Sequence, residues 1–319
     1  MISSQDLKGV MAMMPAFATD DAVDIRTKST VAVDNLVEGV DRIIRDGVNV
    51  IATTGTYGEC YNLLWDEFKT LASATVEAAR GRVPVIIGTT SPNPREVAQK
   101  MEFVRDIKAD GVLLGVPYYW PSSVGDAVRF YQDIGKLFPD LAIVIYHNPE
   151  IHKFTFPVSA FQKLVQVPNI VGMKDSHRDT RAFMQLHRII GGKISHFMNE
   201  LQLHPFYKMG ASGCWSTDVW MGPWPVLHLW DMVQRGESEE KLQALCLELS
   251  GQGGGGRQEL SLGNKRPQEY TSYVKVGPSR VPFVHFPEAV LERAKKKAAH
   301  WETLCAKYRP IVEAERAAA

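Results

Sequence analysis

A lysine that follows a short apolar run is the residue in this sequence best suited to covalent chemistry. Lys174 comes directly after the run IVGM at 170–173, which has the pattern of a buried strand, so its amine is expected in apolar surroundings. Burial disfavours the charged ammonium, and only the neutral amine attacks a carbonyl carbon to form a Schiff base. The alternative interpretation is an ion pair between Lys174 and the adjacent Asp175 or another carboxylate.

A tyrosine and a glycine-containing segment follow two other apolar runs. Tyr146 closes the run at 142–146 and is either a group for chemistry or a core tyrosine with its hydroxyl in water. The segment GTYGE at 55–59 follows the run at 48–52. Its consecutive N–H groups and the Thr56 hydroxyl predict a carboxylate site, with a tight turn that binds nothing as the alternative.

The elements that must position these residues recur along the chain. Apolar runs appear about every 30 residues, each followed by turn residues and a stretch with helical periodicity. The predicted strands lie at 9–15, 48–52, 83–88, 111–115, 142–146, 170–173, 194–197 and 213–216. The predicted helices between them lie at 33–45, 65–80, 94–107, 124–137, 158–165 and 180–190. This pattern predicts an α/β fold, a closed (β/α)8 TIM barrel, whose functional residues lie at the C-terminal ends of the strands.

The pattern changes after the eighth predicted strand. We assign 1–225 to the barrel with the catalytic site and 226–319 to a C-terminal helical extension, with helices at 226–234, 238–250 and 287–308. The glycine-rich run GQGGGG at 251–256 is interpreted as a connection within this extension. No Lys-Ser or Lys-Thr pair follows it, so a phosphate-binding loop is not predicted.

Composition narrows the class of protein and of ligand. The chain has 319 residues, 45% hydrophobic and 23% charged, and 36 basic residues balance 36 acidic ones, which argues against disorder and against nucleic acid as a partner. The four cysteines form no Cys-x-x-Cys pair and the histidines show no metal-ligand spacing, so no metal is predicted.

No apolar run reaches the roughly 20 residues that span a membrane. The run at 9–18 resembles a secretory cleavage site, but Asp6 precedes it and Pro15 interrupts it, which favours a cytoplasmic protein.

Four motifs, in this order and at these spacings, resemble the dihydrodipicolinate synthase and N-acetylneuraminate lyase superfamily of pyruvate-handling class I aldolases. They are GTYGE at 55–59, VPYY at 116–119, YHNP at 146–149 and VGMKD at 171–175. The resemblance implies a (β/α)8 barrel, Lys174 as the Schiff-base lysine and Tyr146 as the proton-relay phenol. It also implies a homotetramer in which Tyr119 reaches the relay of a neighbouring subunit.

Two departures from the superfamily pattern narrow the function. Ile151 stands where dihydrodipicolinate synthases carry an arginine, and Tyr57 replaces the second threonine of the carboxylate motif. The chain is more similar to the hydratase-aldolases of polycyclic aromatic breakdown, which act on trans-o-hydroxybenzylidenepyruvate or trans-2'-carboxybenzalpyruvate. The further motifs that carry this similarity are GTT at 88–90, LGVP at 114–117, WS at 215–216 and GPSR at 277–280.

The resemblance implies an enzyme that hydrates an ortho-substituted benzylidenepyruvate and cleaves it to an aromatic aldehyde and pyruvate, in the degradation of polycyclic aromatic hydrocarbons. In this hypothesis Lys174 forms the Schiff base without any cofactor, Tyr146 and Thr56 pass protons, and Asn148 holds the water. The other predicted substrate contacts are Gly55, Tyr57, Tyr119 and Trp215. Strand alternation turns His147 away from Tyr146.

Two other functions remain as alternatives. One is a pyruvate-dependent lyase or synthase acting on an aliphatic aldehyde or sugar acid, and the other is a barrel that only senses pyruvate. The ortho substituent, hydroxyl or carboxylate, and the number of rings stay open. The candidate contacts for a carboxylate are His196, His204 and Lys208, and Asn264 is a candidate in the stretch 251–273, which no motif aligns.

Overall fold

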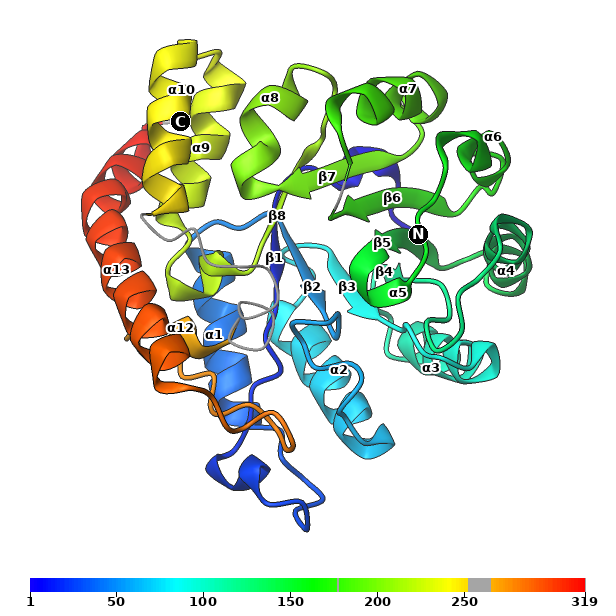
Figure 1. Ribbon diagram of the computed structural model, residues 1–319, viewed down its shortest axis with the longest axis horizontal. Coiled ribbons are helices and arrows are strands. Elements are labelled where there is room, and N and C mark those ends of the chain that lie inside the picture. The colour runs from blue at the N-terminus through cyan, green and yellow to red at the C-terminus, as the bar shows by residue number, and fades with distance from the viewer. Residues whose placement is uncertain (177, 252–264, 319) are drawn as a thin grey trace.

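Eight parallel strands form a closed barrel, which confirms the predicted fold (Figure 1). The computed structural model describes residues 1–176, 178–251 and 265–318. Each strand pairs with the next along the chain, and β8 pairs with β1 to close the ring. The strands are β1 (Gly9–Met13), β2 (Val50–Thr53), β3 (Val85–Gly88), β4 (Gly111–Leu114), β5 (Ala142–His147), β6 (Ile170–Asp175), β7 (Ser195–Asn199) and β8 (Gly213–Ser216).

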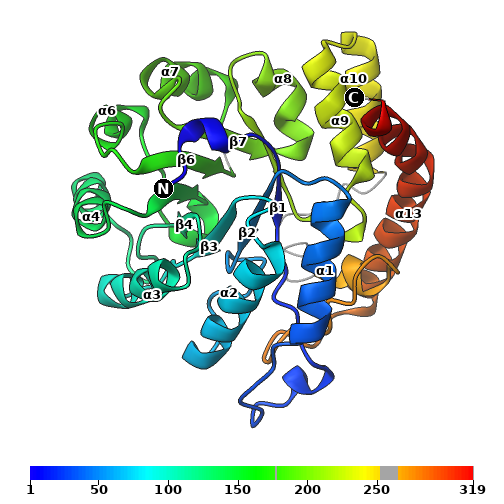
Figure 2. The same ribbon diagram turned by 180° about the vertical axis from the view of Figure 1, so that it is seen from behind.

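Helices surround the barrel, as both views of the chain show (Figures 1 and 2). The α-helices of the barrel are α1 (Val33–Arg45), α2 (Trp65–Ala79), α3 (Pro94–Asp106), α4 (Val124–Leu137), α5 (Pro149–His152), α6 (Phe161–Leu164), α7 (Thr180–Ile190), α8 (Leu203–Tyr207) and α9 (Trp224–Arg235). The 3-10 helices are η1 (Ser4–Asp6), η2 (Asp20–Val23), η3 (Val158–Ala160), η4 (Glu200–Gln202) and η5 (Asp218–Met221). The predicted helix at 158–165 is divided between η3 and α6.

Side-chain caps fix where several helices begin. Asn93 accepts a hydrogen bond from the Arg95 amide ahead of Pro94, the first residue of α3, and Asp179 caps α7 through the Ala182 amide. Ser123 forms a capping box with Asp126 at the start of α4. These caps satisfy amide groups that have no partner within the helix and start each helix at the residue that the sequence pattern predicts.

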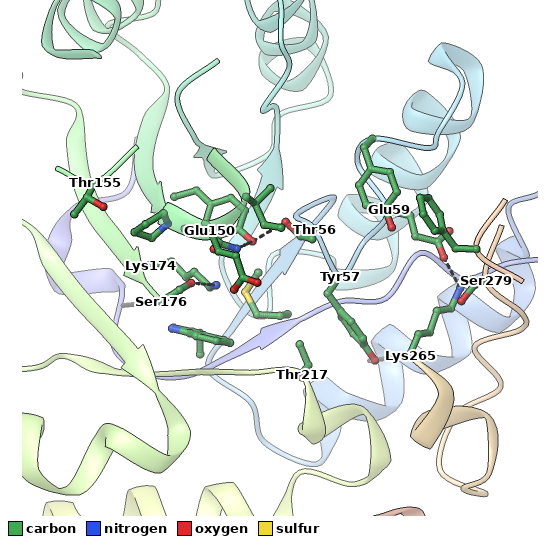
Figure 3. Close-up of a pocket in the computed structure, with 18 residues that line it drawn as sticks. Thr56, Tyr57, Glu59, Glu150, Thr155, Lys174, Ser176, Thr217, Lys265 and Ser279 are labelled. Carbon is green, nitrogen blue, oxygen red and sulfur yellow. Dashed lines mark hydrogen bonds and ion pairs between the residues drawn. The ribbon is translucent and has the colours of Figure 1, made fainter. Parts of the chain in front are cut away.

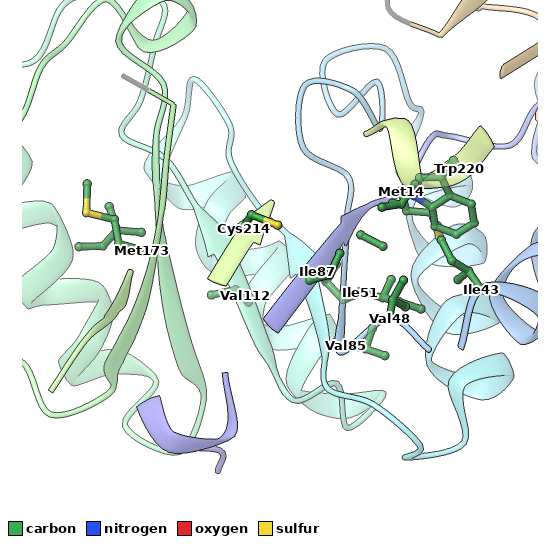
Figure 4. Packing of buried hydrophobic residues seen from close by; sticks show 14 of the residues in the cluster. Met14, Ile43, Val48, Ile51, Val85, Ile87, Val112, Met173, Cys214 and Trp220 are labelled. Atoms are coloured by element: carbon green, nitrogen blue, oxygen red, sulfur yellow. The ribbon is translucent and has the colours of Figure 1, made fainter. Parts of the chain in front are cut away.

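Strand alternation produces two hydrophobic layers. Met11, Met13 and Tyr146 point into the barrel, whereas Val10 and Ile145 point outward to the helices. The outer layer is larger, and its packing is seen around Trp220 and Ile43 (Figure 4). Apolar side chains fill the barrel interior on the N-terminal side of Tyr146. Polar chemistry is therefore confined to the C-terminal ends of the strands.

The C-terminal elements pack on one side of the barrel. They are α10 (Glu239–Ser250), α12 (Arg266–Glu269) and α13 (Glu288–Ala317). The long helix α13 lies against α9 and α12 (Figure 1), and Trp301 on it donates a hydrogen bond of 3.0 Å to the Gly222 carbonyl. Helix α9 follows β8 and contacts β1, so it completes the eighth strand–helix unit of the barrel. The predicted boundary between barrel and C-terminal extension, at 225/226, falls within this helix and stays a prediction. The run 251–256, apart from Gly251, lies outside the described residues.

Candidate active site

A pocket of about 700 Å³ opens at the C-terminal ends of the strands (Figure 3). Barrel strands, the loops that follow them and the C-terminal segment all contribute to its wall. The lining residues are Met13, Thr56, Tyr57, Glu59, Tyr61, Tyr146, Asn148, Pro149, Glu150, Ile151, Thr155, Lys174, Ser176, Trp215, Thr217, Lys265, Ser279 and Phe283. The pocket therefore contains Lys174 and Tyr146 together with much of the predicted site.

Lys174 projects into this pocket from β6 and is almost fully buried, with 3% of its surface exposed. Its ammonium nitrogen lies 3.6 Å from the centroid of the Trp215 ring and 2.7 Å from Ser176 Oγ. Burial lowers the pKa of Lys174 to about 7, against a smaller opposing effect of the Asp175 charge. A large fraction of the amine is therefore neutral near pH 7, as attack on a carbonyl requires.

The alternative of a direct Lys174–Asp175 ion pair does not describe the structure. Adjacent residues of a strand point to opposite faces, so the Asp175 carboxylate lies behind the barrel wall. It is bound there by His147 at 2.8 Å and Arg178 at 2.7 Å. His147 thus turns away from Tyr146, as predicted.

Three of the predicted polar groups form one hydrogen-bonded chain. The Tyr146 hydroxyl donates to Thr56 Oγ1 at 3.0 Å and accepts from Asn148 Nδ2 at 3.3 Å. Burial raises the pKa of Tyr146, and its hydrogen bonds with Thr56 and Asn148 oppose that rise. The phenol stays protonated at neutral pH and is connected to a second hydroxyl, which suits it to pass a proton.

The carboxylate motif forms a tight turn that the C-terminal segment holds from behind. Glu59 adopts φ 52°, a left-handed conformation that is uncommon for residues other than glycine. A Cβ atom on Gly58 would lie 2.7 Å from the Thr54 nitrogen, so this position requires glycine. Arg280 donates a 2.6 Å hydrogen bond to Glu59 from the other end of the chain, and Lys265 lies 3.4 Å from the same carboxylate.

Aromatic and apolar side chains form another part of the wall. Trp215 projects from β8 and is held by a 2.8 Å hydrogen bond from its Nε1 to the Asp175 carbonyl. Tyr57, a predicted substrate contact, lines the same pocket (Figure 3). Phe283 packs edge-on against Tyr61 near the mouth. Ile151 also lines the pocket, so the position of the missing arginine presents an apolar side chain.

The structure places several other candidates away from the pocket lining. Tyr119 has 79% of its surface exposed in the single chain and is not among the residues that line this pocket. His196 is buried behind the barrel wall against Asp175, and both His204 and Lys208 pair with Glu239. Gly55 lies beneath the pocket, where an added Cβ would be 3.7 Å from Tyr146 Cε1. Asn264 lies outside the described residues.

Several pocket residues were not predicted from the sequence, some near Lys174 and some far along the chain. Ser176 lines the pocket and was not predicted, although it lies two residues after Lys174. Lys265 and Phe283 belong to stretches without strand or helix periodicity. The GPSR motif at 277–280 was the one signal for this segment, since it contains Ser279 of the pocket and Arg280 behind it.

The described part of the chain contains neither a metal-binding cluster nor a membrane-spanning helix. No group of three or more histidine, cysteine or acidic side chains there is arranged to hold a metal ion. No helix in residues 1–176, 178–251 or 265–318 is both long enough and apolar enough to cross a membrane.

Comparisons with known proteins agree with this geometry. The sequence pattern of the Dihydrodipicolinate synthetase family matches residues 7–251. The trans-O-hydroxybenzylidenepyruvate hydratase-aldolase of Pseudomonas putida is 32% identical over 96% of this chain and 96% of its own length. The trans-2'-carboxybenzalpyruvate hydratase-aldolase of Nocardioides sp. (strain KP7) is 25% identical over the same shares. A solved structure of PhdJ bound to a substrate intermediate has a TM-score of 0.91 and 29% identity, covering 96% of this chain and 99% of that one.

Proposed function

Because the chain belongs to the dihydrodipicolinate synthetase family, we propose that it is a class I hydratase-aldolase of the kind its curated relatives represent. It is a carbon–carbon lyase that hydrates an ortho-substituted benzylidenepyruvate and cleaves the product to an aromatic aldehyde and pyruvate. We assign this reaction to the degradation of polycyclic aromatic hydrocarbons. The observation that carries the proposal is a buried lysine amine 3.6 Å from the Trp215 ring in a pocket that also holds the Tyr146 phenol.

The reaction begins with a Schiff base. The neutral amine of Lys174 attacks the ketone carbon of the substrate, and loss of one water leaves an iminium conjugated with the alkene and the aromatic ring. Tyr146 and Thr56 carry the protons that the departing hydroxyl needs, since their hydroxyls are 3.0 Å apart. The iminium then serves as the electron sink for the later steps.

Hydration follows at the alkene carbon that bears the ring. We assign the attacking water to Asn148, whose amide lines the pocket and donates to the Tyr146 hydroxyl. Water adds its oxygen at this carbon, and a proton is delivered to the neighbouring carbon. The product is a 4-hydroxy iminium still bonded to Lys174.

Cleavage then runs as a retro-aldol step. The new hydroxyl loses its proton, the bond between the two former alkene carbons breaks, and its electron pair moves into the iminium to give an enamine. The aromatic aldehyde leaves, the enamine carbon takes up a proton, and water hydrolyses the iminium to pyruvate and free Lys174. One water is consumed overall, and the lysine is the only group that bonds covalently to the substrate.

Binding of the substrate uses both ends of the pocket. We propose that the backbone amides of Thr56 and Tyr57 hold the pyruvyl carboxylate, with Gly55 keeping the turn close to Tyr146. Trp215 and the Tyr57 ring would contact the aryl group.

We further propose a cytoplasmic homotetramer in which Tyr119 contacts a neighbouring subunit. The exposure of Tyr119 and Trp120, at 79% and 80%, supports an interface at this loop. Sedimentation equilibrium tests the assembly, and Tyr119→Ala should weaken it.

The substrate class is tested by comparing turnover of three sets of 2-oxo acids. Benzylidenepyruvates with an ortho hydroxyl or an ortho carboxylate should lose their ultraviolet absorbance and yield aldehyde and pyruvate, whereas aliphatic 2-oxo acids should turn over poorly. Lys174→Ala should abolish the activity, and Lys163→Ala, which alters an exposed lysine of α6, should not. Activity should survive dialysis against a chelator. Efficient cleavage of aliphatic substrates alone would establish the aliphatic lyase instead.

A further inference from the structure

The outward faces of β5 and β6 carry a buried polar cluster directly behind the reactive pair. The strand register sets Tyr146 beside Lys174 on the inward face and His147 beside Asp175 on the outward face. The two pairs are therefore one residue apart on the same two strands. Whatever fixes the outward pair also fixes the position of the inward one.

Asp175 is the centre of this cluster. Its Oδ1 accepts a hydrogen bond from His147 Nδ1 at 2.8 Å. Its Oδ2 accepts from Arg178 Nε at 2.7 Å and from His196 Nε2 on β7 at 3.1 Å. Burial alone would raise the pKa of Asp175, but the bonds from His147 and His196 hold it well below its ordinary value, so the carboxylate is ionised.

The orientation of the His147 ring is defined from both sides. The Phe156 amide donates to His147 Nε2 at 3.2 Å, so Nδ1 is the nitrogen that carries the proton to Asp175. His196 stacks on Phe183 with ring centroids 4.7 Å apart, which holds the second imidazole in place. Neither imidazole lines the substrate pocket.

The backbone of Asp175 connects the same cluster to the pocket. Its carbonyl accepts the 2.8 Å hydrogen bond from Trp215 Nε1, and the Trp215 ring lies 3.6 Å from the Lys174 nitrogen. Asp175 thus contacts side chains of β5, β7 and β8 while the residue before it carries the reactive amine.

The ladder between β5 and β6 contains one irregularity. The pairing of β5 with β6 shifts register between Ile143 and Val144, below the reactive residues. An ionised carboxylate in the protein interior is costly to bury, and apolar side chains of similar size would fill the same space. A fully bonded carboxylate at this point is therefore better explained by the need to fix neighbouring strands than by packing.

We propose that Asp175 is a positioning residue of the active site, acting with His147, His196 and Arg178 to set the placement of Lys174, Tyr146 and Trp215. The proposal rests on the function proposed above, because it assigns these groups to the Schiff-base reaction. Asp175 does not touch the substrate: its carboxylate holds the three strands from outside, and its carbonyl holds the indole.

The first test is Asp175→Asn, which keeps the shape of the side chain and removes its charge. Its matched control is Asp110→Asn, because the Asp110 carboxylate binds the Val85 amide at 2.8 Å at the opposite end of the strands. We expect Asp175→Asn to lower kcat for an ortho-hydroxybenzylidenepyruvate about 100-fold, with KM changed less than about threefold, because a small misplacement of the reacting groups mainly slows the chemical step. Asp110→Asn should keep the wild-type kcat.

Asp175→Asn should also move the pH dependence of Schiff-base trapping. Loss of the negative charge of Asp175 removes an interaction that favours the ammonium form of Lys174. The pH at which the trapping rate reaches half of its maximum should therefore fall. In the described chain, Tyr146 on β5, His152 on α5, Glu200 on η4 and Trp215 on β8 surround Lys174. The Asp175 charge acts on it from the outward face of the same strand. A lower melting temperature with wild-type kcat and an unmoved midpoint would overturn the proposal.

A second pair of variants decides the matter if Asp175→Asn does not fold. His147→Leu removes the donor to Asp175, and His147→Asn retains an N–H donor close to the position of Nδ1. We expect kcat to fall at least about tenfold in the leucine variant and to recover to within about threefold of wild type in the asparagine variant. Equal kcat values in the two variants would overturn the positioning role. Failure of the wild-type protein to be trapped by pyruvate would instead refute the proposed function.

Discussion

Replacement of Lys174 by methionine should stabilise the folded protein at neutral pH while it abolishes turnover. Burial lowers the pKa of Lys174 to about 7, whereas the unfolded chain restores the ordinary value of 10.5. Above pH 10.5 the amine is neutral in both states and costs nothing. As pH falls towards 7 the unfolded chain binds a proton that the folded chain does not, so the free energy of unfolding decreases, and the full cost is present below pH 7.

The size of this effect follows from the two pKa values. Their difference corresponds to a cost of at most about 5 kcal/mol below pH 7. Methionine also loses the hydrogen bond to Ser176, worth about 1 kcal/mol. For a chain of this length about 1 kcal/mol corresponds to about 2 °C in Tm. We therefore expect Lys174→Met to raise Tm by about 5–8 °C at pH 6.5–7, with the gain disappearing near pH 10.5.

The assay is thermal unfolding followed by circular dichroism at matched protein concentration across this pH range. Lys163→Met is the control for the loss of one positive charge, because Lys163 is exposed on α6. The quantity to compare is the Tm of each variant minus that of the wild type. If the Lys174→Met difference were the same at pH 7 and pH 10.5, the lysine would not be neutral in the folded protein and the reasoning would fail.

Three other substitutions test separate parts of the site. Tyr146→Phe should lower kcat about 100-fold or more, measured by loss of substrate absorbance, because it removes the relay hydroxyl but keeps the ring. Trp215→Leu should raise KM for benzylidenepyruvates about tenfold and leave that for pyruvate nearly unchanged; equal changes for both would argue against an aryl contact. Arg280→Met should destabilise the fold by about 3–5 kcal/mol in thermal unfolding, because it leaves Glu59 with one ion-pair partner fewer. In the double variant that adds Glu59→Gln, the loss should be less than additive; an additive loss would show that the pair is not coupled.

The repeating part of the fold was predictable because local signals there agree with the tertiary structure. Helices α1, α4 and α7 begin and end at the predicted residues, and Ser123 and Asp179 provide the caps of the last two. The C-terminal helix was predicted to end at Tyr308 but continues to Ala317 through Pro310. Burial of Val312 on the far side of the proline shows that tertiary packing outweighs the local break.

The site was predictable where its residues end strands. Lys174, Tyr146 and Thr56 follow buried runs, and parallel strands bring such positions to one end of a barrel. Lys265 and Phe283 reach the same pocket from a segment without periodicity, so no local pattern could place them. Their position depends on contacts between residues more than 200 positions apart, such as the Arg280–Glu59 ion pair.

Covalent trapping tests the central claim most directly. Incubation of the folded protein with pyruvate and borohydride, followed by intact mass measurement and peptide mapping, should give one reduced pyruvyl adduct per chain, located on Lys174. Lys174→Ala should give none, and Lys163→Ala should be labelled like the wild type. An adduct on another lysine, trapping retained in Lys174→Ala, or no adduct on the folded wild-type protein would contradict the assignment of Lys174 as the Schiff-base residue.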